Sequence, residues 1–143
     1  MRWARCLLLV LLLAVLVVVF WPSRPAGGAQ NGLQAWFDRQ HAARTLPGWV
    51  SFALVEFAAN VAMFVPLGML GTSARPLAGL PRSAAVTVAG CAALSGGIEL
   101  VQWLGFPDRT GDLRDVFANT LGALIGAAVA LCLAAGRRPA RRG

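Results

Sequence analysis

Polar and acidic side chains interrupt three long apolar stretches of this chain, in pairs. The pairs are Glu56 with Asn60, Glu99 with Gln102, and Asp115 with Asn119. The members of each pair are three or four residues apart, so they lie on one face of a helix. A charged side chain at the centre of a membrane helix costs about 2.5 to 3.5 kcal/mol on insertion scales, and ionisable residues there usually mark functional sites. The three pairs therefore predict one shared polar site.

The loop before the last apolar stretch adds Arg109 and Asp112 to this candidate site. The planar guanidinium of Arg109 suits a phosphate, which Glu99 and Asp115 could position. A second interpretation is an enzyme for a lipid-linked substrate, whose carboxylates act as acid and base or hold a divalent cation. A third is a proton relay or a small oligomeric transporter. The residues leave all three open.

The sequence lacks the residues and motifs of metal, nucleotide and nucleophilic catalytic sites. His41 is the only histidine, and Cys6, Cys91 and Cys132 have no metal-site or disulfide spacing. There is no phosphate loop, nucleophile elbow or dinucleotide fingerprint. We therefore predict no metal and no cofactor, and we assign no catalytic residue.

The apolar stretches have the length that a membrane requires. The mean hydropathy is +0.65, and about 20 apolar residues cross about 30 Å of hydrocarbon as a helix. We predict an all-α integral membrane protein, a small bundle of four transmembrane helices. These helices are expected over residues 6–21, 50–72, 84–104 and 113–135. The chain then divides into a first segment 1–21, an outer loop 22–49, a three-helix region 50–135 and a basic tail 136–143.

The first segment has two interpretations. Arg2 and Arg5 precede its apolar run and small residues follow it, as in a secretory signal cleaved after Ala29. The apolar run is long for a signal, and Trp21 suits a membrane interface, so we favour a retained helix.

The outer loop contains a candidate surface helix over residues 32–44. Asn31 and Gln34 resemble a capping box, and Leu33, Trp36 and Phe37 form an apolar stripe. We expect this helix to lie on the outer membrane surface, and an irregular loop is the alternative.

The net charge of +7 comes from thirteen arginines without a lysine. With both termini in the cytoplasm, eight arginines lie on the inner side and five on the outer side, which fits the positive-inside rule. This placement favours a multi-pass protein of the plasma membrane with anionic lipid near its basic tail, and it argues against a nucleic-acid partner.

The predicted last helix carries a stripe that is polar at one end and small at the other. At 100° per residue the stripe lies within an arc of about 80°, and it contains Asp112, Asp115, Asn119, Gly122 and Gly126. The two glycines form a close-packing motif. We expect this stripe to face a similar stripe of the preceding helix, which contains Cys91, Ser95, Glu99 and Gln102. Gly96 and Gly97, beside that second stripe, should ease the close approach of the two helices.

The second predicted helix contains Pro66, followed by Gly68. Because proline lacks an N–H, it removes the hydrogen bond to the carbonyl of Ala62 and should kink the helix. We assign both residues to packing, although a free carbonyl could also join the polar site.

The polar residues could also be a purely structural lock between helices. Hydrogen bonds between membrane helices average only about 0.6 kcal/mol. A set of six polar residues would therefore stabilise the bundle little for its cost, and we favour a functional site.

Three ordered motifs resemble the VanZ-like family of bacterial membrane proteins. They are Asn60-x-x-x-Phe64-x-Pro66-x-Gly68, Glu99-x-x-Gln102, and Arg109-x-x-Asp112-x-x-Asp115-x-x-x-Asn119-x-x-Gly122-x-x-x-Gly126. The resemblance spans roughly Glu56 to Ala130. It implies a small helical protein of the bacterial envelope, in a family named for a member that raises resistance to the glycopeptide teicoplanin. The matching site positions are Asn60, Pro66, Glu99, Gln102, Arg109, Asp112, Asp115 and Asn119.

The functional hypothesis combines this resemblance with the polar site. We expect an outer-facing pocket that engages an envelope lipid or a lipid-linked wall precursor, with an effect on teicoplanin susceptibility. Membrane lipids are then its immediate partners, and it could form oligomers.

Overall fold

The chain is helical throughout the residues that the computed structural model describes, which are 2–19, 25–74, 79–105 and 112–136. These residues form five α-helices and no strand. The helices are α1 (Arg2–Val19), α2 (Pro25–Ala42), α3 (Phe52–Ala74), α4 (Leu80–Gly105) and α5 (Leu113–Gly136). The expected all-α fold is confirmed.

Three of these helices, α3, α4 and α5, are long and apolar enough to cross a membrane. The 18 residues of α1 fall just short of the about 20 that a membrane span needs. The membrane-protein prediction thus rests on three candidate spans, and a fourth span through α1 stays a prediction.

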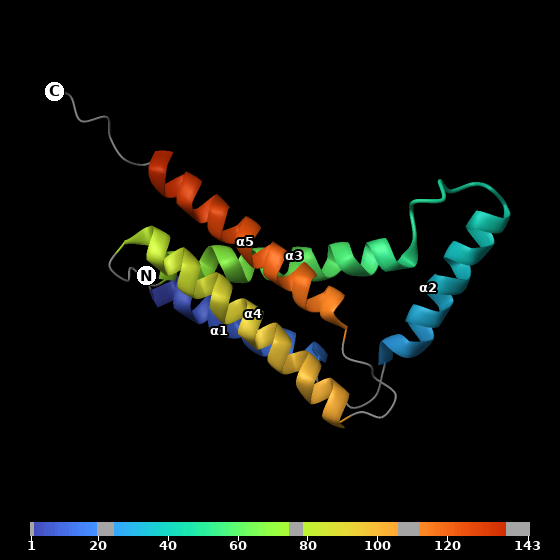
Figure 1. The fold of residues 1–143 in the computed structure, drawn as a ribbon, viewed down its shortest axis with the longest axis horizontal. Coiled ribbons are helices and arrows are strands. Elements are labelled where there is room, and N and C mark those ends of the chain that lie inside the picture. The colour runs from blue at the N-terminus through green and yellow to red at the C-terminus, as the bar shows by residue number, and fades with distance from the viewer. Residues whose placement is uncertain (1, 20–24, 75–78, 106–111, 137–143) are drawn as a thin grey trace.

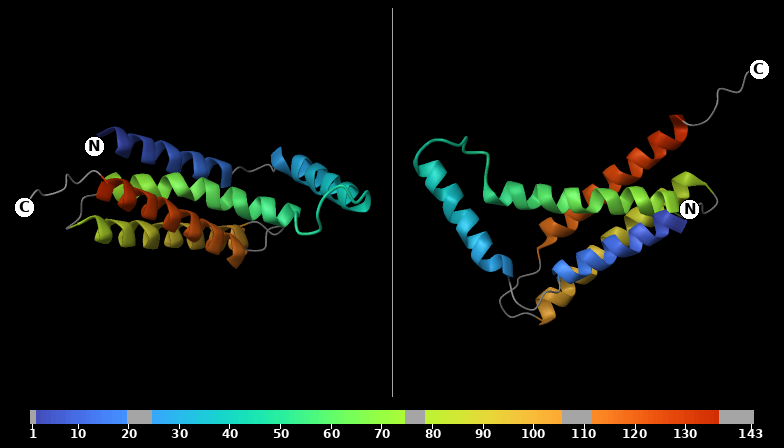
Figure 2. Two further views of the ribbon diagram at one scale, coloured as in Figure 1. Left: turned by 90° about the horizontal axis from the view of Figure 1, so that it is seen from above. Right: turned by 180° about the vertical axis from the view of Figure 1, so that it is seen from behind.

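The bundle is organised around a crossing of α3 and α5 (Figure 1). Helix α4 packs against both of them, and α1 packs against α3. In Figure 1 and in the right view of Figure 2, α3 and α4 diverge from the end where the chain passes from one to the other. The N-terminal end of α5 lies toward the open end of this arrangement, so one end of the bundle brings the start of α3, the end of α4 and the start of α5 together.

Glycines let α3 and α5 approach at backbone distance. A Cβ atom at Gly122 would lie against the carbonyl oxygen of Val61, and one at Gly126 against that of Val65. On α3, a Cβ at Gly68 would meet the carbonyl oxygen of Ala123. Even a methyl group would force these backbones apart.

This crossing corrects our expectation for the last helix. Gly122 and Gly126 face α3, whereas we expected them to face the preceding helix, α4. The expected role of Gly96 and Gly97 is also wrong, because a Cβ at either would meet nothing within 4 Å. The helical wheel identified the small face of α5, but periodicity cannot say which neighbour that face meets.

The core lies between α3, α4 and α5. Phe64, Leu67, Cys91, Ile98 and Ala123 form its buried cluster, and α1 contributes Leu8, Leu11 and Leu12 to its edge. Many large apolar side chains point outward instead, including Trp103, Phe117 and Leu133. Such a surface suits a protein whose surroundings are hydrocarbon.

Helix α2 stands apart from the bundle and contacts α3 (Figure 1). Phe37 is only 6% exposed, and its ring meets that of Trp36 edge-on at 5.1 Å. His41 Nε2 donates a hydrogen bond to the carbonyl of Val50 at 2.9 Å, which ties the end of α2 to the start of α3.

The predicted helix over 32–44 therefore exists, but its start was wrong. Helix α2 begins at Pro25 and ends at Ala42, so Asn31 lies inside it and does not cap it. Proline is common at the first helical position because its fixed φ suits a helix and its missing N–H has no partner there.

Pro66 lies inside α3, which continues as one helix from Phe52 to Ala74. Trp21, the expected interface anchor of the first helix, lies outside the described residues.

Candidate functional site

The predicted polar residues gather at the diverging end of the bundle. Glu56 and Asn60 lie in the first half of α3, and Glu99 and Gln102 in the last two turns of α4. Asp112 immediately precedes α5, while Asp115 and Asn119 lie in its first two turns. Arg109 lies outside the described residues.

A direct hydrogen bond links α3 to α5 within this set. Asn60 Nδ2 donates to Asp115 Oδ1 at 2.8 Å, and both side chains are partly buried. The amide thereby gives the carboxylate one of the donors that it would have had in water. These two residues, 55 positions apart in the sequence, form the centre of the candidate site.

Two acids hold the start of α5. Asp112 Oδ1 accepts a hydrogen bond from the backbone N–H of Arg114 at 2.8 Å, the contact of an N-cap residue. Glu99 Oε2 on α4 accepts one from the backbone N–H of Asp112, also at 2.8 Å. We predicted both acids as members of a binding pocket, and these contacts give them a structural task as well.

Asn119 forms the floor of the site, one helical turn below Asp115. It is 6% exposed, and its Nδ2 donates to Ser95 Oγ of α4 at 2.8 Å. Its Oδ1 is buried without a hydrogen-bond donor among the described residues. A buried acceptor in this state costs about 1 to 3 kcal/mol, so Asn119 retains a polar atom at a cost to stability.

Glu56 is half-buried and accepts no hydrogen bond from the part of the chain that the structure describes. Its carboxylate lies within electrostatic range of Asp115 and Asp112, and of Arg114. Gln102 is also half-buried and makes no hydrogen bond with any described residue. The site thus brings its acids together and leaves several of their acceptor atoms open.

Arg114 is a member of this region that the sequence motifs did not assign. Its guanidinium donates to the carbonyl of Ala53 at the start of α3 and lies 5.6 Å from the ring centre of Phe57. Phe57 in turn stands 6.2 Å from Phe117. The cation–π contact ties α5 to α3 beside the acids. The signal for Arg114 in the sequence is its charge, since it and Arg109 are the arginines within reach of the intramembrane acids.

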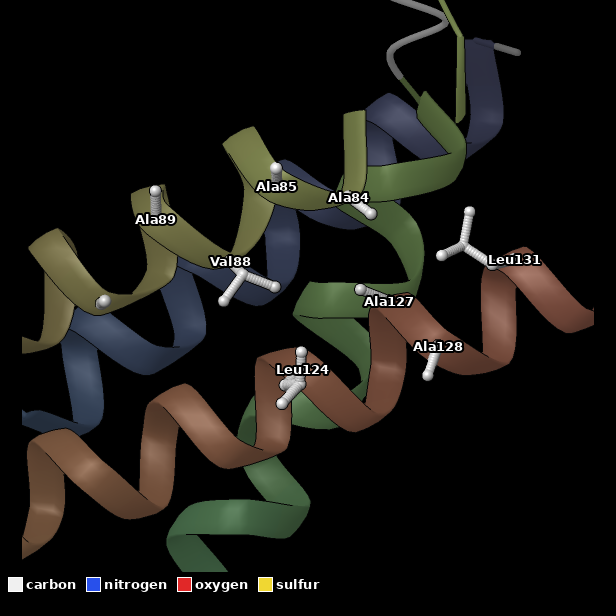
Figure 3. Close-up of a pocket in the computed structure, with 9 residues that line it drawn as sticks. Ala84, Ala85, Val88, Ala89, Leu124, Ala127, Ala128 and Leu131 are labelled. Carbon is white, nitrogen blue, oxygen red and sulfur yellow. The ribbon is translucent and has the colours of Figure 1, made fainter. Parts of the chain in front are cut away.

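The structure also has an apolar groove between α4 and α5, with a volume of about 380 Å³. Figure 3 shows that its lining side chains come from these two helices. The groove lies toward the start of α4 and the end of α5, away from the polar residues. It offers no group for chemistry, and we assign it to contact with hydrocarbon; its lining consists of Ala84, Ala85, Val88, Ala89, Ala92, Leu124, Ala127, Ala128 and Leu131.

A family model, described as VanZ/LLP1, matches residues 8–134 of the chain. The chain belongs to the VanZ family. The match includes α1 and α2, so it is wider than the region from Glu56 to Ala130 that carried the resemblance in the sequence. Neither the curated proteins nor the solved structures gave a match. This VanZ-family chain is thus a helical membrane protein by family and by its three candidate spans.

Proposed function

We propose that this VanZ-family protein uses its polar end to engage a component of the bacterial envelope, an envelope lipid or a lipid-linked wall precursor. The observation that carries the proposal is the meeting of polar side chains from three apolar helices at one end of the bundle, centred on the bond between Asn60 and Asp115. A site between spanning helices at headgroup depth suits a ligand that is itself anchored in the membrane.

The orientation of the protein follows from its charges. Arg82 lies at the start of α4, at the opposite end of the bundle from Glu56 and Asp115. The sequence places Arg137, Arg138, Arg141 and Arg142 after α5. Arginine favours the cytoplasmic side, so the polar end faces outward in the plasma membrane and both termini are cytoplasmic.

The proposal predicts a phenotype that depends on the site acids. In a teicoplanin-sensitive bacterium, the parent protein should raise tolerance to teicoplanin, and the Glu56→Gln and Asp115→Asn variants should lose this effect. Asp38→Asn, an exposed acid of α2, is the matched control and should behave as the parent. Susceptibility to teicoplanin and vancomycin is measured at equal membrane abundance of all variants.

Each result has a defined meaning. Loss of the effect in the two site variants alone supports an envelope function of the polar end. An unchanged phenotype in Glu56→Gln and Asp115→Asn would show that the polar end is not what acts on the envelope.

The second candidate is an enzyme acting on a lipid-linked substrate. Its support is the proximity of two carboxylates, Glu56 and Asp115, because paired carboxylates can exchange roles as acid and base. Incubation of the purified protein with lipid-linked wall precursor, followed by mass spectrometry, tests for a new product.

A further inference from the structure

Among the described residues of the polar end, several acceptor atoms receive no hydrogen bond. Glu56 offers two carboxylate oxygens and receives no hydrogen bond from the described residues. Asp115 receives one, from Asn60. Asn119 Oδ1, in a side chain that is only 6% exposed, receives none from any residue that the structure describes.

The arginine among the described residues of the site, Arg114, makes its direct contacts with the start of α3. Arg114 donates to the carbonyl of Ala53 and lies over the face of Phe57. Its hydrogen bond and its ring contact are therefore with the start of α3, and it acts on Glu56 and Asp115 through its charge alone. Among the described residues, the two acids thus share one cation within electrostatic range, Arg114, and one side-chain N–H donor, Asn60, while Glu56 and Asn119 Oδ1 receive no hydrogen bond.

We propose that the group recognised at this polar end is a primary ammonium, held between Glu56 and Asp115 above the unpaired oxygen of Asn119. An ammonium supplies a positive charge and three N–H donors in one compact group. It would bring the two carboxylates positive charge beyond that of Arg114, and it would give the buried amide oxygen of Asn119 a donor. The inference rests on the proposed function and specifies the chemistry of its ligand.

A divalent metal fits the same residues less well. Among the described residues, no three His, Cys, Asp or Glu side chains come together as a metal site. An ammonium can instead donate one N–H to each of two carboxylates and an amide oxygen.

The ammonium could belong to a phospholipid headgroup or to an amino acid of a wall precursor. The test compares both sources, using the full chain purified in detergent. In the lipid arm, phosphatidylethanolamine, phosphatidylcholine and phosphatidylglycerol with identical acyl chains are titrated and binding is followed by native mass spectrometry. In the peptide arm, a lysine-containing wall stem peptide is compared with the same peptide acetylated on its lysine and terminal amines.

We expect at least about a tenfold preference for the free amine in one of the two arms, because a hydrogen bond to a charged group contributes about 1.5 to 3 kcal/mol. A preference for phosphatidylethanolamine identifies a lipid headgroup, and a preference for the unmodified peptide identifies a wall precursor. Glu56→Gln and Asp115→Asn should each reduce the preference below about threefold, while Asp38→Asn keeps it.

Two results would overturn the inference. One is equal binding of the three lipids together with equal binding of the two peptides by the parent protein, a comparison that needs no variant. The other is an amine preference that survives in both Glu56→Gln and Asp115→Asn.

The test is independent of the teicoplanin phenotype. If the phenotype depends on the site but no amine preference exists, the proposed function stands and the ammonium is wrong. If the amine preference exists without a phenotype, the binding chemistry stands and the predicted effect on teicoplanin tolerance is wrong.

Discussion

The hydrogen bond from Asn60 to Asp115 is one of the contacts that join α3 and α5 at the polar end. Its value to stability is small, because hydrogen bonds between membrane helices average about 0.6 kcal/mol and reach about 1.7. Replacing Asn60 by Ala should lower the free energy of unfolding by about 1 kcal/mol, measured in mixed micelles.

A double-mutant cycle isolates this bond from other effects of the two side chains. Asn60→Ala, Asp115→Ala and the double variant should give a coupling energy of about 0.5 to 1.5 kcal/mol. A coupling near zero would show that the two side chains do not meet in the membrane.

Asn119 is expected to contribute to the proposed function without adding to the stability of the fold. Its buried Oδ1 has no donor among the described residues, so Asn119→Leu removes an unpaired acceptor while keeping the branched shape and the number of side-chain heavy atoms. We expect the unfolding free energy to stay within about 1 kcal/mol of the parent, or to rise, because removing an unsatisfied group offsets the lost bond to Ser95. The effect on teicoplanin tolerance should nevertheless disappear.

The paired control is Ser95→Ala, which removes only the partner of Asn119 Nδ2. This change should destabilise, since it leaves the amide nitrogen without its acceptor as well. If Asn119→Leu destabilises more than Ser95→Ala, the amide has a structural role that its contacts do not show.

At the scale of elements, α3 and α5 can cross at backbone distance because glycines lie at their contact points. Gly122→Ala places a methyl group against the carbonyl of Val61, which is backbone and cannot turn away. Overpacking of this kind costs about 1 to 3 kcal/mol. We expect a corresponding fall in the unfolding free energy of the purified protein.

Gly97→Ala is the matched control, because a Cβ there meets nothing within 4 Å. In a helix interior, alanine is favoured over glycine by about 0.5 to 1 kcal/mol. This variant should be neutral or more stable than the parent. A similar loss for Gly97→Ala and Gly122→Ala would contradict the packing of α5 on α3.

At the scale of the whole molecule, the proposed orientation assigns each end of the bundle to one side of the membrane. Single cysteines at the exposed residues Asp38 and Arg82 report on it, in a background where Cys6, Cys91 and Cys132 are replaced. In intact cells, a membrane-impermeant maleimide should label Asp38→Cys and spare Arg82→Cys, which reacts only after lysis. The reverse pattern would place the polar end in the cytoplasm.

The sequence by itself determined the class of this protein and the helical faces that carry its polar residues. In hydrocarbon, a single spanning segment can pair all its backbone N–H and C=O groups only as a helix. The predicted spans 50–72, 84–104 and 113–135 accordingly correspond closely to α3, α4 and α5. The spacing of Asn60, Asp115 and Asn119 was enough to place them on polar faces, because helical periodicity is a local property.

Only the tertiary structure decided which faces meet. It turned the glycines of α5 toward α3 and its Asn119 toward Ser95 of α4, because the direction in which one helix crosses another depends on side chains far apart in sequence. It also made Asp112 a helix cap and drew Arg114 onto Phe57. These contacts join residues of separate helices or lie at the end of a helix. The periodicity of a single segment cannot predict which residues meet in such contacts.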